Sequence, residues 1–386
     1  MLADGIENIY IYVSDSLRWD YLPDAVSAMG VGFKTVAQSC YSAPSFSTLS
    51  TGRCVPRHGV SRWYDQVPES LDMIYDISGT DGGFYQPGDV ETQAMFSVLR
   101  RDSAIPVSEM SSPFVALERD EQPHLPFTGT DAESVEEYFN ERGDDWDRIR
   151  AEYRDGIEAS VERFQQRLDA LESAGELDST LVIFTSDHGE LFGEYGEAAH
   201  SAPAVPELVY VPTVFIAPSL SASDFTADPD EDVIEHVDVI ETAMETAGHD
   251  FETDGTDLST SRRERDWGYN HVKTTARGKE FYTAEGIWWR DSGHVFHTNS
   301  RLLRALAVLY RFTKGSERQA IRWNVGGLLN AYLPSEKTFG SPPLSRSQAR
   351  SVLEEFIEEL GSESAESGNL SEQAESRLEE LGYLDR

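Results

Sequence analysis

Short hydrophobic runs alternate with polar, glycine-punctuated stretches along most of the chain. Residues 9–13 form a β-branched and aromatic run that predicts a buried strand ending at Ser14. The runs at 114–117, 180–186 and 211–217 have the same character. Strands of this kind, separated by helical patterns, indicate an α/β fold in which helices flank a mixed, mostly parallel central sheet.

Two of the predicted strands are each followed directly by an acidic residue. Asp15 follows the first strand, and Asp187, with His188 beside it, follows the strand at 180–186. Open α/β sheets bind ligands at the carboxyl ends of their strands. A single Asp in this position usually caps the next helix. Two such acids, one of them next to a histidine, favour a metal site.

The segment from Ser42 to Gly52 predicts a short helix with a hydroxyl group at its start. Pro44 lies near the first helical position and Gly52 just past the last, which is the usual arrangement of these residues. Backbone N–H groups without helical partners gather at such an N-terminus and favour an anionic ester. Ser-x-Pro is also a common capping pattern, so this motif alone leaves Ser42 between a structural and a catalytic role.

The last third of the chain differs from the rest. Residues 267–298 alternate aromatic and polar residues with Gly turns and predict a small antiparallel sheet. A short apolar run at 305–309 lies in an Arg-flanked helix and is too short to span a bilayer. We therefore expect an α/β catalytic domain over 1–250, a smaller α+β subdomain over 251–335, and an acidic spacer with a C-terminal helix over 336–386.

The charge of the chain is strongly unbalanced. Its 386 residues include 69 acidic and 32 basic ones, which gives a net charge of −37. A nucleic-acid partner is excluded, because a phosphate backbone needs a positive surface. The excess of acid fits a halophilic protein kept soluble in concentrated salt, which screens self-repulsion over a few ångströms.

Cysteine usage and the N-terminus bear on the compartment. The two cysteines, Cys40 and Cys54, indicate no disulfide framework. The first predicted strand begins by Ile9, which leaves no room for a secretory leader. We expect a cytoplasmic protein without a membrane span, and the sequence indicates no oligomeric state.

Together these motifs resemble the sulfatase family, the arylsulfatase-like branch of the alkaline phosphatase superfamily. That family has an acidic pair after a strand, Cys/Ser-x-Pro-x-Arg-x-x-x-x-Thr-Gly, Pro-His-x-Pro, and Thr-Ser-Asp-His/Asn-Gly-Glu, in this order. The corresponding segments here start at Asp15, Ser42, Pro123 and Thr185, and residues 377–384 match the usual family ending. The agreement in order and spacing covers nearly the whole chain.

The resemblance implies an alkaline-phosphatase-like fold, a bound metal and a set of roles. It implies one divalent cation, Ca²⁺ or Mn²⁺ with Mg²⁺ as a further option, held by Asp15, Asp187 and His188. Ser42, as serine or as formylglycine, would be the nucleophile. His124 and His200 would stabilise or protonate the departing group.

Two departures from the family pattern bear on the chemistry. Ser16 stands where a second acid is usual, so the metal has one carboxylate fewer and Mn²⁺ becomes plausible beside Ca²⁺. Phe46 stands where an Arg helps position the nucleophile and signals its conversion to formylglycine. Unmodified Ser42 is therefore the simpler assumption.

Three functional hypotheses follow. The first is hydrolysis of a sulfate ester of a small molecule or glycan by attack of residue 42. The second is a phosphoester, phosphonate or phosphodiester hydrolase, or a transferase, that uses unmodified Ser42. The third is a non-catalytic family member that binds an anionic glycan, which would follow if Ser16 and Phe46 have disabled the site.

Overall fold

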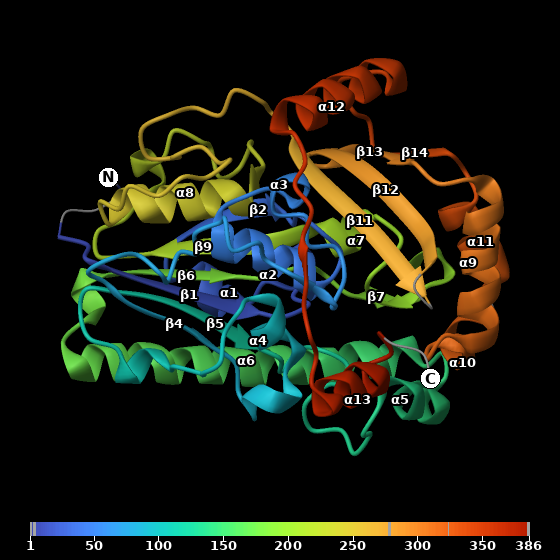
Figure 1. Cartoon of the computed structure of the whole chain (residues 1–386), viewed down its shortest axis with the longest axis horizontal. Coiled ribbons are helices and arrows are strands. Elements are labelled where there is room, and N and C mark those ends of the chain that lie inside the picture. The colour runs from blue at the N-terminus through green and yellow to red at the C-terminus, as the bar shows by residue number, and fades with distance from the viewer. Residues whose placement is uncertain (1, 3–4, 277–278, 323, 384–386) are drawn as a thin grey trace.

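A seven-stranded mixed sheet crosses the centre of the computed structural model, which describes residues 2, 5–276, 279–322 and 324–383 (Figure 1). Within this sheet, β9 is the only described strand that runs antiparallel to the others. The predicted α/β class with a mostly parallel central sheet is confirmed. In spatial order the strands are β10 (Ile234–Glu235), β2 (Val31–Val36), β9 (Tyr210–Ile216), β6 (Thr180–Thr185), β1 (Asn8–Ser14), β5 (Phe114–Asp120) and β4 (Asp81–Tyr85).

Every residue of β1 is buried, because helices cover both faces of the sheet. Successive side chains of a strand point to opposite faces. Tyr12 accordingly packs on Phe164 of the long helix α6 (Trp146–Ala174), with ring centroids 5.1 Å apart. Ile11 instead joins the core on the other face, which includes Phe46 of α2 (Ser42–Thr51). A strand packed on two sides reads as a continuous hydrophobic run, as residues 9–13 do.

The predicted helix that begins at Ser42 is present and fully buried. It starts after Tyr41 and ends at Gly52, whose φ of 64° is a left-handed conformation that glycine adopts without strain. The remaining helices of the first 250 residues are α1 (Asp24–Ser27), α3 (Val55–His58), α4 (Ala94–Val98), α5 (Val135–Arg142), α7 (Pro206–Val209) and α8 (His236–Thr246).

A smaller four-stranded antiparallel sheet lies beside the main one, as expected for the last third of the chain (Figure 1). Its strands are β11 (Gly268–Ala276), β12 (Lys279–Trp289), β13 (Ser292–His297) and β14 (Glu336–Phe339). The helices α9 (Arg301–Lys314), α10 (Arg318–Ile321) and α11 (Val325–Tyr332) connect β13 to β14. The boundary expected after residue 335 precedes β14, which completes this sheet. The three-part division itself stays a prediction.

The C-terminal segment returns to the main domain. After α12 (Arg346–Leu360) the chain crosses back over the molecule, and β15 (Glu366–Ser367) pairs with β3 (Asp65–Gln66). The turn after helix α13 (Glu372–Glu380) then places the half-buried Tyr383 against His124 and His200. A short hairpin pairs β7 (Leu191–Phe192) with β8 (Ala198–Ala199). No helix in the described part of the chain is long and apolar enough to cross a bilayer.

Candidate active site

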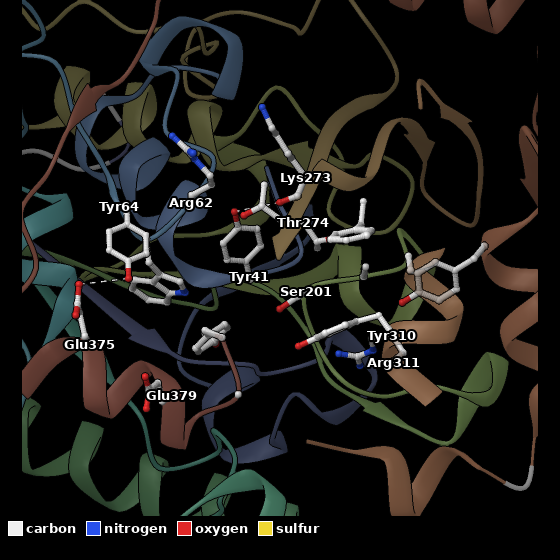
Figure 2. A pocket seen from close by; sticks show the side chains of 18 residues that line it. Tyr41, Arg62, Tyr64, Ser201, Lys273, Thr274, Tyr310, Arg311, Glu375 and Glu379 are labelled. Carbon is white, nitrogen blue, oxygen red and sulfur yellow. Dashed lines mark hydrogen bonds between the residues drawn. The ribbon is translucent and has the colours of Figure 1, made fainter. Parts of the chain in front are cut away.

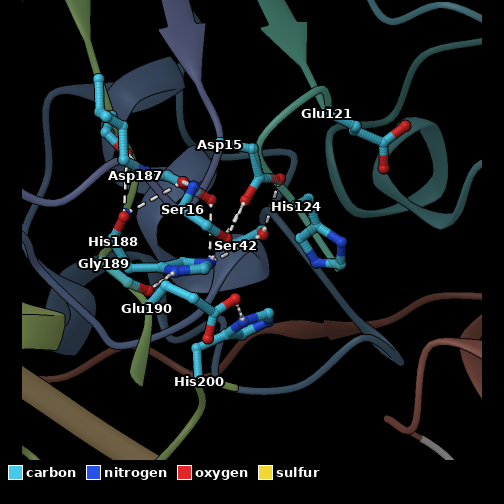
Figure 3. Close-up of polar contacts among 12 residues, drawn as sticks. Asp15, Ser16, Ser42, Glu121, His124, Asp187, His188, Gly189, Glu190 and His200 are labelled. Atoms are coloured by element: carbon cyan, nitrogen blue, oxygen red, sulfur yellow. Dashed lines mark hydrogen bonds and ion pairs between the residues drawn. The ribbon is translucent and has the colours of Figure 1, made fainter. Parts of the chain in front are cut away.

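The carboxyl ends of three neighbouring strands meet at one point of the main sheet. β1 pairs in parallel with β6 on one side and β5 on the other, with Val13 opposite Thr185 and Ser14 opposite Asp120. Asp15 and Asp187 therefore leave the sheet side by side. Figure 3 shows them with Ser42 and His188, and with His124 and His200 nearby.

Asp15, Asp187 and His188 form a compact, fully buried cluster. One ligand atom from each lies within 4.8 Å of the others. His188 Nδ1 lies 2.9 Å from the carbonyl oxygen of Gly189 and donates to it, which leaves Nε2 to face the carboxylates. This Nε2 faces Asp187 Oδ2 at 3.3 Å and Asp15 Oδ1 at 3.7 Å. Nε2 is thus the ring nitrogen that could serve as a metal ligand beside the two carboxylates.

The residues of this cluster fit a divalent cation. Asp187 Oδ2 is buried and accepts no hydrogen bond among the described residues. Burial raises the pKa of Asp187 to about 6, and the negative charge of nearby Asp15 adds to this effect. Each buried carboxylate makes ionisation of the other less favourable. A cation would relieve both problems. Two carboxylates and one imidazole form a mixed oxygen and nitrogen donor set that suits Mn²⁺ as well as the harder ions.

Ser42 lies against this cluster at the start of α2. Its Oγ is 3.2 Å from His188 Nε2 and 3.5 Å from Asp15 Oδ2. Arg119 donates to the same Oγ from Nη2 at 3.2 Å. The hydroxyl therefore has proton acceptors on one side and a positive charge on another, which is the environment of an activated nucleophile.

Arg119 is a site residue that sequence reasoning missed. Its Nη2 lies 2.6 Å from Asp15 Oδ2, and its guanidinium lies over the Phe46 ring, 5.5 Å from the centroid. Burial alone would lower the pKa of Arg119, but the carboxylates of Asp15 and Glu121 raise it above its usual value. The strand alternation carried the signal, since Leu117 and Arg119 share the face of β5 that packs on α2.

Ser16, which replaces the family's second acid, adopts an unusual backbone conformation. Its φ is 64°, a left-handed value that is uncommon for a residue with a side chain. Its Oγ donates to Asp15 Oδ1 at 2.9 Å and its N–H to Asp187 Oδ1 at 3.1 Å. Ser16 thus orients both carboxylates and adds no charge of its own.

The second half of the site is a chain of hydrogen bonds between histidines. His124 Nδ1 donates to the carbonyl oxygen of Leu125 at 2.6 Å, so its Nε2 accepts from the Tyr383 hydroxyl at 3.1 Å. The Tyr383 oxygen can then accept from His200 Nε2, which leaves His200 Nδ1 to accept from Glu190 at 3.3 Å. Burial raises the pKa of Glu190 well above its usual value, consistent with a protonated carboxyl group that donates.

The two halves are in direct contact. The His200 ring centroid lies 4.4 Å from that of His188 and 5.0 Å from that of His124. Burial lowers the pKa of His124 and lowers that of His200 further, so both rings are neutral at pH 7. The structure thus brings the six sequence-predicted residues together in one cluster.

Tyr383 and Glu190 are further site residues that the sequence analysis did not assign. Both lie in segments that carried the family resemblance, Glu190 in residues 185–190 and Tyr383 in the C-terminal ending. Burial, then the charge of Asp15, raises the pKa of Tyr383 well above its usual value, so that it keeps its proton. No sequence pattern indicates that a residue near the end of the chain contacts His124 and His200.

A cavity of about 360 Å³ opens beside the histidines (Figure 2). It is lined by aromatic, basic and acidic side chains and by the backbone around Ser201. Its aromatic residues are Tyr41, Trp63, Tyr64, Phe281, Tyr310, Tyr332 and Tyr383, and its charged residues are Arg62, Lys273, Arg311, Glu375 and Glu379. Tyr41 precedes Ser42 and Ser201 follows His200, so the cavity leads toward the buried cluster and Tyr383 stands between them.

Comparisons with known proteins agree with this architecture. The family model described as Sulfatase matches residues 38–249. The low-salt glycan biosynthesis sulfotransferase Agl7 of Haloferax volcanii is 30% identical over 400 aligned positions, which cover 98% of this chain and 97% of that protein.

Two solved structures show the same fold at low identity. A 2-O GAG sulfatase superimposes with a TM-score of 0.60 at 15% identity and covers 92% of both chains. The phosphonate monoester hydrolase of Agrobacterium radiobacter has a TM-score of 0.57 at 16% identity, over 75% of this chain and 87% of its own. The sequence match extends over more than half of the chain and the full-length relative over nearly all of it. This chain belongs to the sulfatase family.

Proposed function

We propose that this protein is a metal-dependent sulfuryl-transfer enzyme. It cleaves the sulfate ester of a carbohydrate with Ser42 as the nucleophile. The observation that carries the proposal is the convergence of the Ser42 hydroxyl with Asp15, Asp187 and His188 in one buried cluster. Membership of the sulfatase family supports an enzyme that acts on ester bonds. The name of the full-length relative supports the sulfuryl group and a glycan.

Asp15, Asp187 and His188 would hold the cation. A divalent cation in such a site neutralises the charge of a bound anion and lowers the pKa of a nearby hydroxyl. Arg119 would donate to a non-bridging sulfate oxygen or hold the Ser42 oxygen in line, because its Nη2 already reaches that oxygen. Ser16 would keep both carboxylates oriented.

The covalent steps follow from the position of Ser42. Its oxygen attacks sulfur and passes its proton to Asp15 Oδ2, which it faces at 3.5 Å, while the bond from sulfur to the ester oxygen breaks and the sulfuryl group passes to Ser42. The departing oxygen then takes a proton from the hydrogen-bonded set of His124, His200 and Tyr383. In a second step a hydroxyl acceptor attacks the sulfur of the sulfated serine and gives its proton to the same set. The bond from sulfur to the Ser42 oxygen breaks, and that oxygen takes back the proton held by Asp15.

Exclusion of water favours a hydroxyl acceptor over water in the second step. Ser42, Asp15 and Asp187 have no exposed surface, and Tyr383 separates them from the cavity. Hydrolysis, the leading hypothesis from the sequence, shares the first step and differs only in what attacks second. The aromatic and charged lining of the cavity suits sugar rings and anionic substituents.

The experiment combines mass, metal and turnover. The mass of the peptide that contains Ser42 shows whether the residue is serine or has lost two hydrogens as formylglycine. The metal-free protein is then assayed with Ca²⁺, Mn²⁺ or Mg²⁺ on an aryl sulfate, with and without sugar acceptors, in high salt. We expect cation-dependent release of the aryl alcohol and a sulfated sugar. If Asp187→Ala leaves every activity unchanged, the assignment is wrong.

The same assay decides the alternatives. An unmodified Ser42 is what a phosphoester, phosphonate or phosphodiester hydrolase would use, and Phe46 favours the unmodified form. Faster turnover of aryl phosphate, aryl phosphonate or bis-aryl phosphate than of aryl sulfate would select that hypothesis. Binding of a sulfated glycan without turnover of any ester would select the non-catalytic one.

A further inference from the structure

Helix α9 buries basic side chains and exposes apolar ones, which is the reverse of the usual pattern for a helix at a water-exposed surface. Arg304 and Arg311 point into the protein, where Arg304 donates to the carbonyl oxygens of Asn299 and Leu333 and Arg311 pairs with Glu197. The solvent side instead carries four large apolar side chains one helical turn apart. These are Leu302, Leu306, Leu309 and Phe312.

Helix α11 extends this surface with Val325 and Leu329. We call these six side chains the apolar patch. They are six of the seven large hydrophobic side chains that are exposed in the described part of the chain, and the exposed fraction reaches 71% at Leu302 and 56% at Leu309. A concentration of this kind marks an interaction site, whereas single exposed leucines do not.

The chain segment that carries the patch is basic, unlike the protein as a whole. Between Asp291 and Glu336 the chain carries a single acid, Glu317, which is buried, together with six Arg or Lys residues. Of these six, Arg304 and Arg311 point inward, and Arg318 pairs with Glu136. Arg301 and Lys314 are exposed at the two ends of α9. The rest of the chain is strongly acidic, since the total is −37.

We propose that the apolar patch docks on an anionic lipid bilayer and holds the protein at a membrane surface. A helix with a leucine and phenylalanine face and basic ends is the usual form of an interfacial helix, which lies in the headgroup region without crossing the membrane. Its basic ends face the negative lipids. In concentrated salt the Debye length is only about 3 Å, so acidic side chains farther than that from the bilayer repel its lipids weakly.

Charge argues against two other occupants of the patch. In a twofold contact between copies of this chain, the basic ends of one α9 would meet those of the other and repel. An acidic partner protein would neutralise the basic residues at the two ends of α9. It would leave unexplained why the apolar face is a narrow stripe on the outermost helix of the molecule, where Figure 1 shows α9 and α11 at the edge.

The patch and the cavity are on opposite sides of the same helix. Ala307, Tyr310 and Arg311 of α9 line the cavity, whereas Leu306 and Leu309 face outward. Docking through the patch would therefore bring the cavity close to the bilayer. This inference is independent of the proposed chemistry, because no patch residue lies in the buried cluster or lines the cavity.

Vesicle flotation with the full-length protein tests the proposal. Vesicles of phosphatidylglycerol are compared with vesicles of phosphatidylcholine at two salt concentrations at which circular dichroism shows the protein folded. We expect binding to the anionic vesicles, weaker binding to the neutral ones, and a difference that shrinks at the higher salt. Binding to neither type of vesicle would overturn the proposal.

Two sets of variants assign the binding to the patch. The triple variant Leu302→Ser/Leu306→Ser/Leu309→Ser should lower vesicle affinity by roughly tenfold or more, because most of the inserted apolar surface is lost. The control Ala151→Ser/Gln165→Ser/Gln166→Ser places three serines at exposed positions of α6 that carry no large apolar side chain, and it should bind like the wild type. Equal binding of both triple variants would overturn the proposal.

The basic ends and the oligomeric state complete the test. Arg301→Gln/Lys314→Gln should lose affinity for the anionic vesicles only, whereas Arg148→Gln/Arg346→Gln, exposed elsewhere, should not. Light scattering without lipid tests whether a second copy of this chain occupies the patch instead of a bilayer. A wild-type dimer that the leucine triple variant converts to a monomer would assign the patch to a second copy and overturn membrane docking. All of these variants should keep the same turnover of a soluble aryl ester.

Discussion

The two halves of the site are built in different ways. The nucleophile side, made of Asp15, Ser42, Arg119, Asp187 and His188, comes from the ends of β1, β5 and β6 and from the start of α2. The histidine side, made of His124, Glu190, His200 and Tyr383, comes from loops and from the C-terminal segment. The first is fixed by strand register and helix packing. The second is held together by a chain of hydrogen bonds.

This difference indicates a division of labour. Charge is concentrated on the nucleophile side, where two carboxylates, a guanidinium and a candidate metal site surround one hydroxyl. The histidine side is neutral at pH 7, because burial lowers the pKa of both His124 and His200. We expect the nucleophile side to affect every substrate equally and the histidine side to affect only substrates whose leaving group needs a proton.

The largest expected effect is the loss of the nucleophile. Ser42→Ala should lower kcat by roughly 10³-fold or more for good and poor leaving groups alike, because the covalent step disappears. Ser45→Ala is the matched control, since Ser45 lies on the same helix, is fully buried and has a hydroxyl without a partner among the described residues. Steady-state kinetics on an aryl sulfate measure both. Equal activity of the two variants would remove Ser42 from the mechanism.

Arg119 should rank second on the nucleophile side. Arg119→Met should lower kcat by roughly 10²-fold to 10³-fold, because a buried positive charge beside the reacting oxygen is lost. The double variant Phe46→Arg/Arg119→Met tests whether Arg119 replaces the arginine that the family carries at position 46, since the guanidinium lies over the Phe46 ring. We expect it to regain at least about tenfold over Arg119→Met. No gain in a folded double variant would contradict this replacement.

The histidine side should show a dependence on the leaving group. His200→Gln and His124→Gln should each lower kcat by about 10²-fold for a sugar sulfate, whose alkoxide must be protonated. The loss should be less than about tenfold for nitrophenyl sulfate, which leaves without a proton. The ratio of the two losses, measured on the same protein preparation, is the readout. Equal losses on both substrates would place these histidines with the nucleophile side.

A titrating histidine behind α2 allows a pH test of the nucleophile side. His58 Nδ1 accepts from the Val60 N–H at 3.1 Å, so its Nε2 donates to Thr48 Oγ1 of α2 at 3.0 Å. This pairing needs the neutral ring, and burial, with a smaller effect of His271, lowers the pKa of His58 to about 3. The unfolded chain binds the proton near pH 6.5, so the stabilisation is complete above that pH and is lost as the pH falls toward 3.

Between pH 7 and pH 5 this one residue should lower the free energy of unfolding by about 2 kcal/mol. Urea unfolding of the wild type and of His58→Gln at both pH values measures it. The variant should start from a lower stability and lose about 2 kcal/mol less on acidification than the wild type. The same pH dependence in both proteins would show that His58 is already protonated, or exposed, in the fold.

The same contrast explains what the sequence predicts. Residues 9–13 and 180–186 reveal their strands because both faces are packed, and Asp15 and Asp187 follow from those strands. The fold class and the family are confirmed, whereas the roles of the site residues stay predictions. The partnership of Tyr383 with His124 is invisible in the sequence, because it depends on the path of residues 361–371 across the molecule. Arg119 could be predicted as a site residue only from the alternation of side chains along β5.

The smallest expected effect concerns the hydroxyl that joins the histidines to the cavity. Tyr383→Phe keeps the ring that separates the buried cluster from the cavity but removes the bonds to His124 and His200. We expect kcat on a sugar sulfate to fall by only about threefold to tenfold, because the two histidines remain. Tyr64→Phe is the control, since Tyr64 lines the same cavity and bonds to Glu375. Tyr383→Ala should in addition raise the ratio of hydrolysis to sulfuryl transfer, because water then reaches Ser42. If Tyr383→Ala leaves that ratio unchanged, the C-terminal segment does not exclude water, and the difference between the two halves lies in the histidines alone.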